Sequence, residues 1–159
     1  MMEEKLAKIY SKLGNYIVSM IPVEWSKVHY LGEVGDEKSN WSSVFYFYCA
    51  DNNQIIRSHD MLEIYNISME IYNELLAEAN SYLLEIYDCF QEYEQELWDQ
   101  LSFTIDNSGQ FNINYIYNIS DDDGPVKREA VWAYETFGFM PEEGTFERGL
   151  LDEYLRNKG

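Results

Sequence analysis

Carboxylates are the residues in this sequence whose type and spacing could do chemistry. Positions 58–126 hold 15 Asp and Glu residues, and no Lys or Arg occurs between Arg57 and Lys127. At about 100° per residue of an α-helix, eight of these carboxylates fall within about 80° of one another. The eight are Glu70, Glu74, Glu78, Glu85, Asp88, Glu92, Glu96 and Asp99. Such a face could attract a basic partner, or it could supply paired carboxylates for acid–base catalysis.

Two interpretations of this face stay open. The first is the solvated side of an amphipathic helix, which is the default for any charged stripe. The second is a binding face, because neighbours such as Glu70 and Glu74 form like-charge i,i+4 pairs, and each pair destabilises a helix by about 0.2–0.5 kcal/mol. Carboxylates one turn apart, about 6 Å, also approach the charge density of a nucleic-acid strand. A protein that normally binds phosphates could therefore bind this helix.

Other candidate sites are weaker. His59-Asp60, with Glu63 nearby, could hold a metal ion, but the spacing matches no zinc motif. The run Asp121-Asp122-Asp123-Gly124 lacks the alternate ligands and the distant Glu of an EF-hand, and helix capping explains it better. The sequence contains no GxSxG, HExxH or phosphate-binding loop. We therefore expect no enzymatic activity, no metal and no cofactor, with a carboxylate-based enzyme as the alternative.

Composition limits the kinds of partner. The chain has 159 residues, of which 46% are apolar and 16% aromatic, and this suits a single domain over residues 1–159. The net charge of −18 disfavours binding to nucleic acid or to an anionic membrane, because both need a cationic surface. Cys49 and Cys89 form no CxxC motif, and the N-terminal segment lacks the basic region of a signal peptide. We expect reduced thiols in a cytoplasmic protein, and the oligomeric state stays open.

A long helix must position the carboxylates. We predict that it begins near Asn66 or Ser68, both good N-caps, and runs to about Tyr93 or beyond. The rest of the chain follows the order α-β-β-α-β-β-α-α. The remaining elements are predicted as a helix over 3–21, a hairpin of 26–35 and 42–50, a hairpin of 102–106 and 110–119, and helices over 125–136 and 142–157. This pattern predicts an α+β fold with an antiparallel sheet of two β-hairpins, the long acidic amphipathic helix between them, an N-terminal helix and two C-terminal helices.

One predicted strand is aromatic on both sides. Phe45 and Phe47 alternate with Tyr46 and Tyr48, so each pair faces one side of the sheet. If both faces of this strand were exposed to solvent, they would form a large apolar patch on the surface. We predict that one face packs on the long helix, and that a further helix or a partner covers the other.

Several stretches resemble one family of bacterial proteins. The most specific are Ile21-Pro22-Val23-Glu24-Trp25, after the first helix, and Tyr65-Asn66-Ile67-Ser68, at the entry to the long helix. Others are VFYFY (44–48), SHDMLEIYNIS (58–68), LWDQLSFTIDNSGQFNINYIY (97–117), REAVWAYETFGFMPEE (128–143) and LLDEYL (150–155). From residue 2 to about 156, the sequence resembles the YezG/EsaG-like immunity proteins of Gram-positive bacteria.

The resemblance implies an antitoxin. Members of this family bind the toxic nuclease domain, the C-terminal domain, of LXG-type toxins that a type VII system secretes, and the family brings no catalytic residues with it. We therefore expect the eight carboxylates to complement the cationic nucleic-acid-binding surface of a cognate toxin. The alternative is an acidic adaptor for another basic protein.

Overall fold

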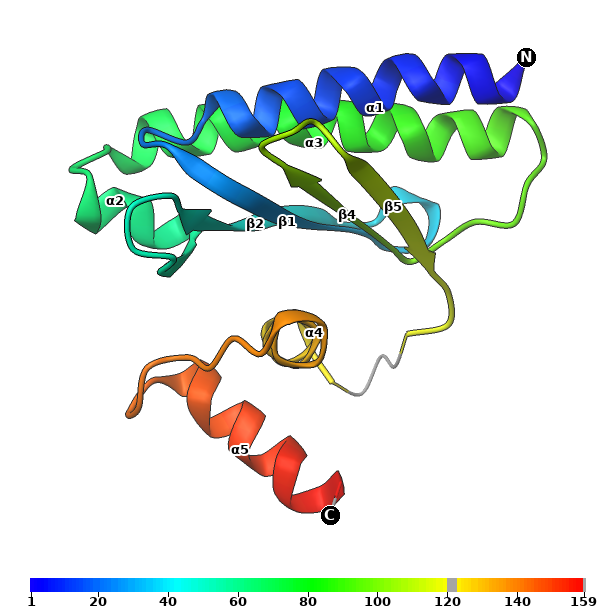
Figure 1. Cartoon of the computed structure of the whole chain (residues 1–159). Helices are drawn as coiled ribbons and strands as arrows, with labels where there is room; N and C mark the ends of the chain where they lie inside the picture. Colours follow the sequence, from blue (N-terminus) through cyan, green and yellow to red (C-terminus); the bar gives the residue numbers. More distant parts are fainter. Residues whose placement is uncertain (120–122, 159) are drawn as a thin grey trace. The chain divides into compact units, whose positions relative to one another are not determined.

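A five-stranded antiparallel sheet organises the first part of the chain, in a computed structural model that describes residues 1–119 and 123–158 (Figure 1). Its strands are β1 (Trp25–Val34), β2 (Trp41–Cys49), β3 (Ile55–Arg57), β4 (Gln100–Asp106) and β5 (Phe111–Ile116). The strand order is β3-β2-β1-β4-β5. β1 and β2 form one hairpin, β4 and β5 form the other, and pairing of β1 with β4 joins them. The predicted α+β class with two hairpins is confirmed, and β3 adds a short edge strand.

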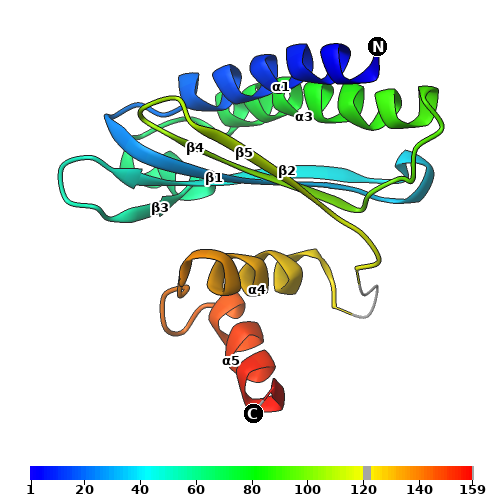
Figure 2. The same ribbon diagram turned by 45° about the vertical axis from the view of Figure 1, so that its right-hand side comes forward.

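Two long helices, α1 (Met2–Ser19) and α3 (Met69–Glu92), cover one face of this sheet (Figures 1 and 2). They run antiparallel, because Lys5 contacts Glu92 while Tyr16 contacts Tyr82. Their apolar sides and one face of the sheet form a common core. Its most deeply buried side chains include Leu13, Ile17, Phe45, Phe47, Leu83, Ile86 and Leu101. Each such side chain contributes about 1.5–3 kcal/mol by leaving water, so this core holds α3 firmly on the sheet.

A local signal sets the start of α3. A short helix, α2 (Met61–Ile64), precedes it, and the Oγ of Ser68 then caps α3 by accepting a hydrogen bond from the backbone N–H of Ile71 at 3.1 Å. The predicted N-cap at Ser68 is therefore confirmed. The helix ends at Glu92, and Glu94 adopts a left-handed conformation with φ of 53°. The acidic helix is thus 24 residues long and ends beside Tyr93, the nearer of the two predicted limits.

A glycine allows α3 to approach β1 closely. A Cβ added at Gly32 would lie 2.6 Å from Cδ1 of Leu83 and 2.9 Å from the hydroxyl of Tyr30. That hydroxyl is held in place, because it bonds the Oγ of Ser43 at 2.6 Å and Ser43 donates in turn to Asn80 on α3 at 2.6 Å. Close packing and two linked hydrogen bonds, one buried and one partly buried, therefore hold the helix and the sheet together at this point.

The aromatic strand β2 lies inside the sheet, between β1 and β3. Phe45 and Phe47 are fully buried in the core that α3 closes, so the prediction for that face is confirmed. The cover of the opposite face, which carries Tyr46 and Tyr48, stays a prediction. No helix in the described parts of the chain is long and apolar enough to cross a bilayer.

The chain divides into two compact units, Met1–Ile119 and the segment that follows. The second unit contains α4 (Pro125–Phe137) and α5 (Phe146–Lys158). Gly138 ends α4 in the left-handed conformation, at φ of 74°. Asp121 and Asp122, part of the predicted capping run, lie outside the described residues. The prediction of a single domain over 1–159 stays a prediction.

The cap of α4 and the start of α5 differ from what the sequence predicted. Asp123 forms an ion pair with Lys127 at 3.4 Å, and Gly124 precedes α4 without a side-chain cap, so Asp123 does not act as the predicted cap. The predicted start of the last helix at residue 142 is also wrong. α5 begins at Phe146, because Oγ1 of Thr145 accepts a hydrogen bond from the N–H of Arg148 at 3.2 Å.

Candidate functional site

Six of the eight predicted carboxylates lie on α3, and all six are exposed. They are Glu70, Glu74, Glu78, Glu85, Asp88 and Glu92. The buried side chains of the same helix, among them Ala79, Leu83 and Ile86, face the core. α3 therefore presents its acidic side to solvent and its apolar side to the sheet, as the periodicity predicted.

The other two carboxylates do not belong to this face, so the prediction that eight carboxylates lie on one side of the helix is wrong for Glu96 and Asp99. Glu96 is exposed in the segment after α3, beyond the left-handed Glu94. Asp99 holds the sheet: its Oδ2 accepts from the N–H of Ile119 at 3.1 Å, and its backbone bonds Val34 and Ile116. The prediction that all eight carboxylates share one face was wrong because it required a continuous helix over residues 70–99. No glycine or proline marks the actual end of the helix.

Two of the six carboxylates on α3 have basic partners from other elements. Glu92 accepts from Lys5 of α1 at 2.5 Å, and Asp88 accepts from Lys38 in the turn between β1 and β2 at 2.7 Å. The hydrogen bond to Glu92 raises the pKa of Lys5. These cations lie 87 and 50 residues away in the sequence, so helical spacing could not reveal them.

The remaining four carboxylates lack such partners. In the part of the chain that the structure describes, no Lys or Arg nitrogen lies within 4 Å of Glu70, Glu74, Glu78 or Glu85. Among the described residues, Glu78 accepts one long hydrogen bond, from the hydroxyl of Tyr82 at 3.4 Å. An exposed face with charges of one sign acts over a distance on a charged partner.

The metal candidate gains no support from the geometry. The ring of His59 packs edge-on against Tyr72, with 5.7 Å between ring centroids. Among residues 1–119 and 123–158, no three His, Cys, Asp or Glu side chains are grouped so that they could hold a metal ion.

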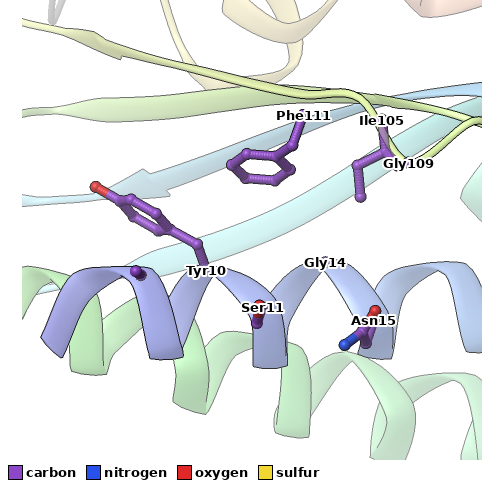
Figure 3. A pocket seen from close by; sticks show the side chains of 8 residues that line it. Tyr10, Ser11, Gly14, Asn15, Ile105, Gly109 and Phe111 are labelled. Atoms are coloured by element: carbon purple, nitrogen blue, oxygen red, sulfur yellow. The ribbon is translucent and has the colours of Figure 1, made fainter. Parts of the chain in front are cut away.

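A separate groove lies between α1 and the β4–β5 hairpin. Figure 3 shows Tyr10 and Gly14 of α1 on one side of it and Ile105 and Phe111 on the other. Its volume is about 340 Å³, and Gly14 makes room for it, since a Cβ there would lie 3.1 Å from Ile105. None of its lining residues carries a carboxylate, imidazole or thiol. The carboxylates of α3 therefore do not line this groove.

Comparison with known proteins decides the family. The model of a family described as "Immunity protein YezG-like" matches residues 6–150. The chain belongs to the YezG-like immunity protein family. Its relatives include the immunity protein YezG of Bacillus spizizenii, 34% identical over 158 residues, which cover 98% of this chain and 96% of the relative. YezG of Bacillus subtilis is 33% identical over 138 residues, 85% of this chain and 89% of the relative.

A third relative is named after a secretion system. It is named type VII secretion system protein EsaG, from Staphylococcus aureus, and is 31% identical over 143 residues, 88% of this chain and 86% of the relative. The YezG-like model spans both compact units, from α1 into α5, so the acidic helix and the C-terminal helices belong to one family pattern. Membership of an immunity family implies a cognate toxin as the partner, and a binding role.

Proposed function

We propose that this chain neutralises the nuclease C-terminal domain of an LXG-type toxin by binding its cationic nucleic-acid surface with the acidic side of α3. One observation carries the proposal: an exposed helix face bears six carboxylates, and four of them lack a basic partner among the described residues. Membership of an immunity protein family implies a toxin as the partner. The name of the staphylococcal relative supports secretion of that toxin by a type VII system.

The physical argument starts from the toxin. A nuclease must hold phosphates with Lys and Arg, so its substrate-binding surface is cationic. Carboxylates one helical turn apart are about 6 Å from each other and offer that surface a substitute polyanion. Attraction of this kind acts mainly on the association rate, and at 0.15 M salt it is screened beyond about 8 Å.

This function requires binding and no chemistry by the chain itself. An antitoxin of this kind works in the cytoplasm, where the toxin would otherwise reach the nucleic acid of the producing cell. Bound across the cationic surface, the chain would keep nucleic acid from the toxin's active site.

Co-purification with the C-terminal domain of the toxin encoded next to this gene, followed by a nuclease assay, tests the proposal. We expect a stable complex whose nuclease activity falls to background at equal amounts of the two proteins. A basic protein of similar charge without nuclease activity serves as the control and should not be retained. Failure to form a complex, or undiminished nuclease activity in the complex, would overturn the proposal, and the second outcome would favour an adaptor role.

A further inference from the structure

α1 and α3 are of unequal length, and part of α3 extends beyond α1. Tyr16 packs on Tyr82, with 5.9 Å between ring centroids, and Lys5 pairs with Glu92, so the register of the antiparallel pair is fixed at two points. α1 ends at Ser19, three residues after Tyr16, whereas α3 begins at Met69, thirteen residues before Tyr82. About ten residues of α3, residues 69–78, therefore extend past the end of α1 by about 15 Å at 1.5 Å per residue. We call residues 69–78 the overhang.

The overhang and the rest of α3 differ in their electrostatic surroundings. Glu70, Glu74 and Glu78 lie on the overhang, which contains no Lys or Arg. Glu85, Asp88 and Glu92 lie on the part beside α1 and the β1–β2 turn, where Lys5 and Lys38 are paired to two of them. Lys12, seven residues after Lys5, falls on the same side of α1 as Lys5. Among the described residues, all three carboxylates of the overhang therefore lack a Lys or Arg partner, whereas on the rest of α3 only Glu85 does.

Exposed apolar side chains lie at the same end of α3. Ile71 is 53% exposed and Met69 is 49% exposed, and Ile64 of the preceding α2 is 52% exposed. On a helix, Ile71 lies beside Glu74 at i+3 and on the same side as Glu78 at i+7. A large apolar side chain in water, bordered by carboxylates, is typical of an interaction surface with an apolar centre and a charged rim.

We infer that the toxin docks on the overhang, with Ile71 as the apolar contact and Glu70, Glu74 and Glu78 as its charged rim. This inference rests on the proposed function and narrows it, because it assigns the contact to one end of α3. The surface fits a cationic protein surface that carries an exposed apolar side chain among its Lys and Arg residues. The carboxylates act on association by attracting that surface, and Ile71 acts on dissociation by excluding water from the contact.

Two matched triple variants test the electrostatic part. The overhang variant is Glu70→Gln, Glu74→Gln and Glu78→Gln, and the control variant is Glu85→Gln, Asp88→Asn and Glu92→Gln. Both remove three carboxylates from the same helix, so they change the net charge equally. We expect the overhang variant to associate with the toxin domain several-fold more slowly than the parent and with a flatter dependence on salt. The control variant should stay within twofold of the parent. Equal losses in the two variants, or a larger loss in the control, would overturn the inference.

A pair of single variants tests the apolar part. Ile71→Ala should raise the dissociation rate at least tenfold, while the association rate changes little. Leu97→Ala, which alters an exposed apolar side chain outside α3, should leave both rates unchanged. Circular dichroism of all variants confirms that they fold. Parent-like dissociation of Ile71→Ala would overturn the inference but not the proposed function, whereas failure of the parent chain to bind the toxin domain would overturn both.

Discussion

Gly32 offers a direct test of how α3 is held on the sheet, because it is the point of closest approach to β1. In Gly32→Ala the new Cβ would lie 2.6 Å from Cδ1 of Leu83, whereas ordinary contacts begin at 3.4 Å. The two groups must therefore separate by about 0.8 Å, which is the difference between these distances. Leu83 is fully buried, and Tyr30, the other neighbour, is fixed by its hydrogen bond to Ser43. We expect a loss of about 1–3 kcal/mol in the free energy of unfolding, the usual cost of an overpacked core.

Urea unfolding of four proteins measures this effect as a double-mutant cycle. The four are the parent, Gly32→Ala, Leu83→Ala and the double variant. Leu83→Ala alone should lose about 2–5 kcal/mol, because it leaves a cavity in the core. In the double variant the added methyl group occupies part of that cavity, so the combined loss should be smaller than the sum of the two single losses by about 1 kcal/mol or more. Additive losses would refute the argument that Gly32 and Leu83 are fitted to each other.

Three further predictions concern local structure and chemistry. Ser68→Ala should lower the free energy of unfolding by about 1 kcal/mol, because it removes the N-cap of α3, while Ser68→Asn should retain most of the stability. Asp106→Ala should destabilise the β4–β5 turn, because the carboxylate of Asp106 accepts hydrogen bonds from Ser108 and Gln110. These hydrogen bonds lower the pKa of Asp106. The difference in the free energy of unfolding between variant and parent should therefore be full above pH 3.8 and disappear as the pH falls further. The purified chain should show no nuclease or other hydrolase activity with or without divalent metal ions, and metal-dependent turnover that disappears in His59→Ala would contradict this.

Features set by neighbouring residues could be predicted from the sequence. Ser68 is a good N-cap followed by a helical pattern, and Gly138 ends α4 in the left-handed conformation that glycine adopts freely. Alternation in β2 placed Phe45 and Phe47 on one face, and both are buried in the core. In each case the signal lies within a few residues of the feature that it determines.

Features set by distant contacts could not be predicted in this way. Periodicity continues from Glu92 to Asp99 although the helix does not, because the chain turns at Glu94 without a glycine or proline. The lysines that pair with Asp88 and Glu92 come from other elements, so only the fold reveals which carboxylates are compensated. The overhang depends on the register between α1 and α3, which side-chain packing sets and no local motif encodes. The start of α5 is different, because Thr145 is a good N-cap directly after Gly144 and so marks this start within the local sequence.

The association rate of the purified chain with the C-terminal domain of its toxin, measured at two salt concentrations, tests the central claim most directly. The comparison is between the parent and a variant with Glu74→Gln, Glu78→Gln, Glu85→Gln and Glu92→Gln combined. If the acidic side of α3 binds the toxin by charge complementarity, the variant should associate several-fold more slowly, with a flatter salt dependence and an intact fold. If the rate and its salt dependence match those of the parent, the carboxylates form only a solvated face and the toxin binds elsewhere on the chain.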